Sequence, residues 1–366
     1  MMWCWAIHAN GEPREALKLS QVPVPPSPPS GSNLLIRVTH AAINPADTSL
    51  FNAWIPFRGR PGFDFIGSVV GVGPKVPVQI KRLMSGMEVV GALGLNQILW
   101  GAGTLAEYVQ VPAELVALKP PNLTTEQALG CGIAGQTAVM VMKEAGAVEG
   151  LRVLVNGASG GVGTVLLQIL KARGARVVGI CSQRNEQLIK RLGADEVRLS
   201  GPLTTVQEAQ LTADTYASDP LDLIIDCVGD NAMFTKSPAY LQPKGKFIEI
   251  VPGRTQGMLP FIMNQLRPVY LGGTPRQYKI LGLAPSGRYA HELAQWIEDG
   301  QVKEILIDSE YKMKDVVQAY DKLMTRRATG KIVIKIQERL GSGPQLEADT
   351  ARGVGQVSRT PPSTGS

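Results

Sequence analysis

The sequence predicts a two-domain α/β protein, in which a β-rich part accompanies a doubly wound parallel sheet. Three observations lead to this class. The chain has 366 residues, a length typical of about two domains. Its 44% hydrophobic and 19% charged residues supply enough apolar material for a core. From about residue 125, apolar strands alternate with helices, a pattern typical of a parallel sheet covered on both faces.

The first 120 residues predict mostly β-structure. Short segments rich in Val and Ile, punctuated by Gly and Pro, occupy residues 33–38 (NLLIRV), 65–72 (FIGSVVGV) and 105–111 (LAEYVQV). Residues 22–32 (VPVPPSPPSGS) are expected to form an extended surface loop, because proline fixes φ and lacks a backbone donor.

The alternating part begins at residues 124–127 (TTEQ), where capping-type residues open a helix. The strands expected after it are residues 151–156, 176–181, 221–228 and 246–251, with helices over 161–173 and 185–192. Near the end, helices are expected over 291–299 and 313–324, and a closing strand over 331–336. Residues 340–366 are rich in Gly, Ser, Thr and Pro without periodicity, which predicts a disordered tail.

Composition argues against several classes of protein. The net charge is +6, but the basic residues are scattered and aromatic residues are only 5%, so nucleic-acid binding is not expected. No apolar run approaches the length of a membrane span, and the N-terminus lacks the pattern of a secretory signal. The four cysteines are far apart in the sequence, which predicts a reducing, cytoplasmic location and no cysteine-rich metal site.

The strongest motif is the glycine-rich turn in residues 151–163 (LRVLVNGASGGVG), between an expected strand and an expected helix. A dinucleotide fingerprint has glycines at positions one, three and six, which fall here on Ala158, Gly160 and Gly163. Small residues let the backbone approach a pyrophosphate at the positive end of the helix. The turn therefore predicts cofactor binding by Ala158, Ser159, Gly160, Gly161, Val162 and Gly163, and the alternative is a plain glycine-rich strand-to-helix turn.

The end of the next strand predicts which dinucleotide binds. NAD-binding proteins usually place Asp or Glu there to bind the ribose 2′-hydroxyl, and this chain has Ser182 and Arg184 instead. Arginine offers a fixed fork of donors that suits a phosphate. We therefore expect NADPH, with Ser182 and Arg184 at its 2′-phosphate; the alternative for Arg184 is an exposed residue at a helix start.

Several passages together resemble the medium-chain dehydrogenase/reductase superfamily, in its zinc-free branch of quinone oxidoreductases and trans-acting enoyl reductases. They are the glycine turn and residues 38–47, 61–72, 128–138, 192–195 and 329–333. The resemblance covers about residues 5–336. It implies a GroES-like catalytic domain over 1–124 and 271–339, and a Rossmann NADP-binding domain over 125–270.

The resemblance also implies roles for particular residues. Asn44, Phe63 and Asp64 match metal-ligand positions of zinc-dependent members, and Cys131 lies near another, so no metal is expected. Asn44 and Asp47 are expected at the catalytic end of the cleft, although a turn held by Asx hydrogen bonds explains them equally. Thr137 matches a residue that contacts the cofactor. The resemblance further suggests an apolar substrate wall, for which core packing is the alternative: Phe51, Trp54, Phe57 and Phe63.

The function implied is a zinc-independent, NADPH-dependent reductase that transfers hydride to an activated C=C bond or a quinone. One alternative is a trans-acting enoyl reductase that works with a polyketide synthase. Another is a non-catalytic NADPH-binding structural or regulatory protein, as lens crystallins related to this branch illustrate. A small-molecule substrate is expected, no nucleic acid and no membrane, and a homodimer is left open.

Overall fold

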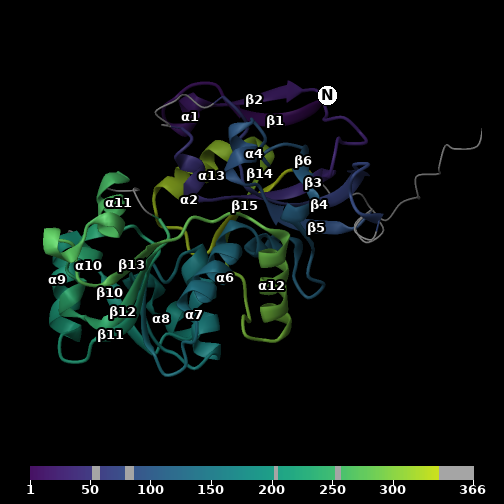
Figure 1. Ribbon diagram of the computed structural model, residues 1–366. Coiled ribbons are helices and arrows are strands. Elements are labelled where there is room, and N and C mark those ends of the chain that lie inside the picture. Colours follow the sequence, from purple (N-terminus) through teal and green to yellow (C-terminus); the bar gives the residue numbers. More distant parts are fainter. Residues whose placement is uncertain (52–57, 79–85, 202–204, 252–256, 338–366) are drawn as a thin grey trace, which may run out of the picture.

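The computed structural model describes residues 1–51, 58–78, 86–201, 205–251 and 257–337. Two layered parts lie side by side, a β-rich part and a part built on a parallel sheet (Figure 1). The expected tail, residues 340–366, lies outside the described residues, as do Trp54 and Phe57. No helix in the described ranges is long and apolar enough to cross a membrane.

The β-rich part contains a seven-stranded sheet in which the long strand β3 is central. The order is β14-β15-β3-β4-β5-β7, with β6 also pairing with β3, and β1 and β2 form a separate antiparallel pair. The strands are β1 (Met2–Ile7), β2 (Leu17–Val22), β3 (Asn33–Ile43), β4 (Asp64–Val72), β5 (Glu88–Ala92), β6 (Tyr108–Pro112), β7 (Val116–Leu118), β14 (Ile307–Lys312) and β15 (Lys331–Lys335). The helices are α1 (Pro13–Ala16), α2 (Pro45–Thr48), α4 (Leu95–Leu99) and α13 (Val316–Met324).

The second part is a six-stranded sheet in the order β10-β9-β8-β11-β12-β13, and all its strand pairs are parallel. Its strands are β8 (Arg152–Asn156), β9 (Arg176–Ser182), β10 (Glu196–Ser200), β11 (Leu221–Asp226), β12 (Leu241–Glu249) and β13 (Gln277–Ile280). Its helices are α5 (Thr125–Ala128), α6 (Ile133–Ala145), α7 (Gly161–Ala172), α8 (Glu186–Arg191), α9 (Thr205–Tyr216), α10 (Asn231–Thr235), α11 (Leu259–Leu266) and α12 (Gly287–Glu298).

Alternate residues of the parallel strands enter two different hydrophobic clusters, as a sheet covered on both faces requires. In β8, Val153 and Val155 join the cluster that includes α6 and α7, whereas Leu154 joins the cluster of α9 and α10. The predicted doubly wound sheet is therefore confirmed. The strand order reverses on either side of β8, and ligands bind at the carboxyl edge of such a switch point.

The expected end of the parallel-sheet part at residue 270 is too early. Strand β13 pairs with β12 in this sheet, and α12 packs with α6 in the same hydrophobic cluster. The short sequence of β13 (QYKI) has little apolar character of its own, so it is not among the four strands that the sequence predicts for this sheet, and neither is β10. The parallel sheet thus extends to about residue 281, and the chain returns to the β-rich sheet at β14.

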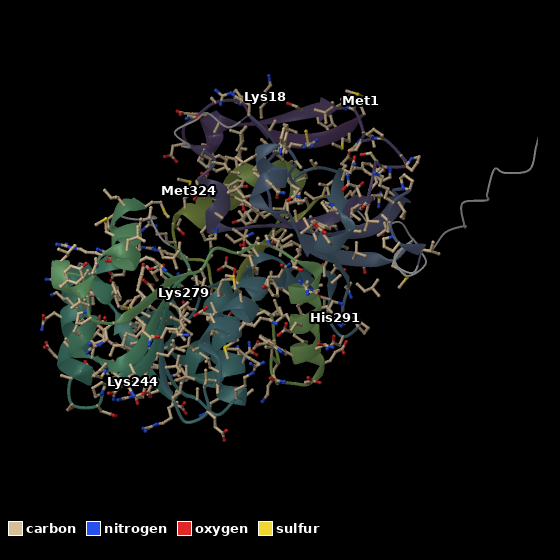
Figure 2. The ribbon with its side chains drawn as sticks, in the orientation of Figure 1. Met1, Lys18, Lys244, Lys279, His291 and Met324 are labelled. Carbon is tan, nitrogen blue, oxygen red and sulfur yellow. The ribbon has the colours of Figure 1, made fainter. Side chains whose placement is uncertain are left out.

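The carboxyl edge of the parallel sheet faces the β-rich part. Lys244, within β12, lies at the end of the sheet farther from that part, whereas Lys279 on β13 lies nearer to it (Figure 2). The two parts also meet through a backbone bridge between Gly160 and Gly330. The loops that follow the parallel strands therefore lie between the two parts.

Candidate active site

The glycine turn joins β8 to α7 in the geometry that the sequence predicts. Gly157 has a φ of +77°, which favours glycine, and the amide of Ala158 donates to the carbonyl of Ile180 on β9. A Cβ placed on Gly163 would lie 2.4 Å from the carbonyl oxygen of Gly157, so this position requires glycine. Helix α7 thus begins directly against the turn, and its first amides can bind a pyrophosphate.

The turn after β9 brings Ser182 and Arg184 to the adjacent position along the same edge. Ser182 is half-buried and Arg184 is exposed. The Arg184 guanidinium donates a hydrogen bond to the carbonyl of Arg327, from the segment between α13 and β15. The backbone of the segment before β15 therefore lies beside Arg184. No local sequence pattern predicts this contact, because the two segments are 143 residues apart.

Asn44 and Asp47 form a capping box around the short helix α2. The Asp47 carboxylate accepts from the amide of Asn44 at 2.7 Å and from the amide of Gly62 at 2.7 Å. Burial is the largest effect on Asp47 and raises its pKa to about 7, against the lowering effect of these two amides. The geometry therefore gives Asp47 a role in holding the turn and the chain at Gly62.

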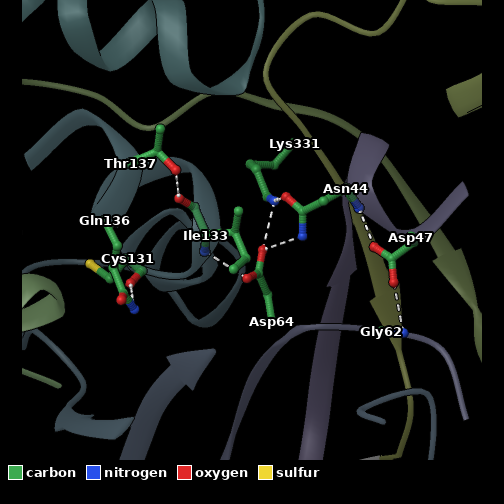
Figure 3. Close-up of polar contacts among 9 residues, drawn as sticks. All are labelled: Asn44, Asp47, Gly62, Asp64, Cys131, Ile133, Gln136, Thr137 and Lys331. Carbon is green, nitrogen blue, oxygen red and sulfur yellow. Dashed lines mark hydrogen bonds and ion pairs between the residues drawn. The ribbon is translucent and has the colours of Figure 1, made fainter. Parts of the chain in front are cut away.

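A buried polar cluster lies beside this turn, where Asn44 meets Asp64 and Lys331 (Figure 3). The Lys331 ammonium donates to Asn44 Oδ1 at 2.6 Å and to Asp64 Oδ2 at 2.7 Å, and Asn44 Nδ2 donates to Asp64 Oδ2 at 2.9 Å. The amide of Ile133, at the start of α6, donates to Asp64 Oδ1 at 2.7 Å. Asp64 is 0% exposed and Lys331 4%, so this is a buried ion pair with nearly every partner supplied.

The described residues do not fit a zinc ion at this place. Two positions that resemblance aligns with metal ligands, Asn44 and Asp64, are joined by the Lys331 ammonium, whose charge a nearby cation would oppose. Phe63 packs in the hydrophobic core. Burial raises the pKa of the Cys131 thiol to about 12, whereas a metal ligand must be a thiolate. In the described ranges, no group of three His, Cys, Asp or Glu side chains is placed to hold a metal.

Thr137 lies on α6, one turn beyond the residues that approach α7. Its hydroxyl donates to the carbonyl of Ile133 in its own helix at 2.7 Å, and the residue is 7% exposed (Figure 3). Phe51, expected in an apolar substrate wall, is buried and packs edge-on against Tyr320 at 4.9 Å between ring centroids. The structure thus places Phe51 and Phe63 in the core of the β-rich part.

The segment from Arg327 to Lys331 contacts the glycine turn, the turn after β9 and the buried polar cluster. The amide of Gly330 donates to the carbonyl of Ser159 in the glycine turn, and the Thr329 hydroxyl lies 3.4 Å from Asn185 Oδ1. A Cβ placed on Gly161 would lie 3.4 Å from Lys331 Cδ. The buried cluster therefore adjoins the start of α7. In the sequence, residues 329–333 (TGKIV) contribute to the family resemblance, but no local pattern predicts a role for Lys331.

Comparison with known proteins assigns both parts of the chain. Residues 30–121 match the alcohol dehydrogenase GroES-like domain, and residues 192–334 match the zinc-binding dehydrogenase family. The chain is similar to the medium chain reductase pydE of Acremonium sp, with 32% identity over 91% of this chain and 98% of that protein. It is also similar to the trans-enoyl reductase poxH of Penicillium oxalicum (strain 114-2 / CGMCC 5302), with 30% identity over 92% and 98%.

Among solved structures, the quinone oxidoreductase from Coxiella burnetii is similar, with a TM-score of 0.76 and 25% identity over 92% of this chain and 99% of that one. The fold and the relatives define a GroES-like domain joined to a Rossmann domain. The chain belongs to the medium-chain dehydrogenase/reductase superfamily, in its branch of quinone oxidoreductases and enoyl reductases. The predicted family and fold class are therefore confirmed.

Proposed function

We propose that the protein is an NADPH-dependent reductase that needs no metal and reduces an activated C=C bond or a quinone. The observation that carries this proposal is the contact between the glycine turn and the buried Asn44–Asp64–Lys331 cluster. The glycine turn suits the pyrophosphate of a dinucleotide. The cluster places the Lys331 ammonium beside that turn. The relatives named as reductases support the same class of reaction.

The residues along the carboxyl edge fit NADPH. The turn over residues 158–163 would hold the pyrophosphate, since its amides and the start of α7 are positive. Ser182 and Arg184 would hold the 2′-phosphate, with the Arg184 guanidinium held by its hydrogen bond to the carbonyl of Arg327. Thr137 is proposed as a further contact from α6. When bound, NADPH supplies a hydride.

Reduction of an enone or enoyl thioester adds a hydride to the β-carbon and moves the π electrons to the carbonyl oxygen. We propose that Lys331 stabilises the negative charge on that oxygen. Its ammonium has three N–H donors, and the described residues supply two close acceptors, Asn44 and Asp64. Asn44 would act at this site as a partner that orients Lys331, and Asp47 as the residue that holds the turn. The proton for the α-carbon would come from water or from an unassigned group.

A second reading of the substrate is an enoyl chain attached to a polyketide synthase. Relatives named trans-enoyl reductases, poxH and pgmF, favour it. A homodimer is also consistent with the family. Light scattering tests that assembly: twice the chain mass of 39.2 kDa would support it, and the single mass would remove it.

The test is a screen of NADPH oxidation over quinones, enones and enoyl thioesters, the thioesters both free and attached to a synthase carrier domain. Turnover of a free substrate supports the first reading, and turnover of the carrier-bound thioester alone supports the second. Tight NADPH binding without turnover in any class would favour a non-catalytic binding protein. Absence of NADPH binding would refute the proposal.

A further inference from the structure

Two carboxyl groups are buried next to each other at the carboxyl edge of the parallel sheet. Asp226 ends β11 and Glu249 ends β12, and the two residues are paired in the parallel register. Asp226 is 0% exposed and Glu249 is 1% exposed. On the other side, Asp226 is paired with Asn156, the last residue of β8 before the glycine turn. A row of three polar residues therefore ends the three strands nearest the expected cofactor.

The partners of the two carboxyl groups are unequal. Asp226 accepts from Asn156 Nδ2 at 2.9 Å, from the amide of Val228 at 2.8 Å and from the amide of Asp230 at 2.6 Å. Glu249 accepts one hydrogen bond, at Oε1, from the amide of Val251 at 2.8 Å. Its Oε2 is buried and meets no donor in the described part of the chain, and the Glu249 carboxyl lies within hydrogen-bonding reach of the Asp226 side chain. Burial raises the pKa of Asp226 as well, but its N–H donors oppose that rise, and Glu249 has only one such donor.

The surroundings of Glu249 oppose a second negative charge. The titratable groups that face it are Asp226 and Asp230 on the β11 side, Cys227 between them and Tyr278 on β13. Burial is the largest effect and, with the charge of Asp226, raises the pKa of Glu249 to about 9. Because more donors stabilise a charge on Asp226, a single proton shared by the pair lies on Glu249.

This pair holds the first residues of the two loops that follow β11 and β12, at the edge where the cofactor is expected. Asp226 holds residues 228–230 after β11, and Glu249 holds Val251 after β12. The first of these loops touches the glycine turn, because a Cβ on Gly157 would lie 3.0 Å from Val228 Cγ2. A repulsion between the two carboxylates would separate residues 228–230 from Val251 at the edge where the cofactor is expected to lie.

We propose that Glu249 is a positioning residue for the cofactor: in its protonated form it holds Val251, which follows β12, beside Asp226, and its ionisation loosens NADPH binding. Nothing in this inference requires Glu249 to touch the cofactor. The inference rests on the proposed binding of NADPH. It adds that the protonated form of Glu249 supports this binding and that the ionised form does not. A neutral glutamine at this position should reproduce the protonated form, since its amide can both accept from Val251 and donate toward Asp226.

The experiment is a fluorescence titration of NADPH binding across pH 7 to 11 for the wild type, Glu249→Gln and Asp226→Asn. With one linked proton, the wild-type Kd should rise about tenfold one pH unit above the transition of Glu249. Glu249→Gln should bind as tightly as the wild type at neutral pH and lose this dependence. Asp226→Asn should move the transition to lower pH, because it removes the neighbouring charge. Glu298→Gln, at an exposed position on α12, is the matched control and should follow the wild type.

The outcomes separate the two proposals. If the wild type does not bind NADPH at any pH, the proposed function itself fails. If the wild type binds NADPH and shows the same pH profile as Glu249→Gln, the role of Glu249 is wrong and the proposed function stands. A wild-type Kd that is constant up to pH 11 would also overturn the role of Glu249, even if Glu249→Gln did not fold.

Discussion

Replacement of Lys331 by methionine tests whether its ammonium neutralises the buried carboxylate of Asp64. At the observed separation of 2.7 Å, the Coulomb attraction is about 6 kcal/mol with an effective dielectric constant near 20, before the cost of desolvation. Removal of one partner from a buried ion pair typically costs about 3–5 kcal/mol. Asp64 keeps hydrogen bonds from Asn44 and Ile133, so we expect the lower end, about 3 kcal/mol, for Lys331→Met.

The assay is urea unfolding followed by tryptophan fluorescence, with the free energy of unfolding taken from the midpoint and slope. Lys18→Met replaces an exposed lysine of the β-rich part and should change stability by less than about 0.5 kcal/mol. The double variant Lys331→Met/Asp64→Asn carries neither charge, so its loss should be smaller than the sum of the two single losses. If Lys331→Met lowers the free energy of unfolding by less than about 1 kcal/mol, or if the two single losses add strictly in the double variant, Lys331 does not neutralise Asp64 in the folded state.

The remaining predictions concern the cofactor, the metal and the turn at residue 47. Arg184→Ala should weaken NADPH binding about tenfold, because hydrogen bonds to a charged group contribute about 1.5–3 kcal/mol, and should leave the NADH dissociation constant nearly unchanged. Equal losses for both cofactors, or a wild type that prefers NADH, would defeat that assignment. Metal analysis of the purified protein should find no stoichiometric zinc, and one tightly held ion per chain would contradict the ion-pair interpretation. Asp47→Asn leaves one acceptor for the amides of Asn44 and Gly62, so urea unfolding should show a loss of about 1–3 kcal/mol; unchanged stability would mean that the capping box contributes little.

Local patterns in the sequence were sufficient for much of the parallel-sheet part. Helix α7 begins at Gly161, as predicted, and strands β8, β9 and β15 lie within one residue of their predicted limits. These elements are well determined because a buried strand, a glycine turn and an amphipathic helix each leave a short-range signal. The same local character places Ser182 and Arg184 at the end of β9, and their contact with the 2′-phosphate stays a prediction.

The tertiary structure alone decided how distant polar residues meet. Lys331 contacts Asn44 and Asp64 across 287 and 267 residues of sequence, and no periodicity or spacing links such positions. Asp226 and Glu249 are neighbours only because β11 and β12 pair in that register. The sheet also recruits β13, whose four residues carry little hydrophobic signal. Composition and periodicity specify the elements with a strong local signal, whereas the pairing of strands specifies the weaker ones and which buried charges must be neutralised by one another.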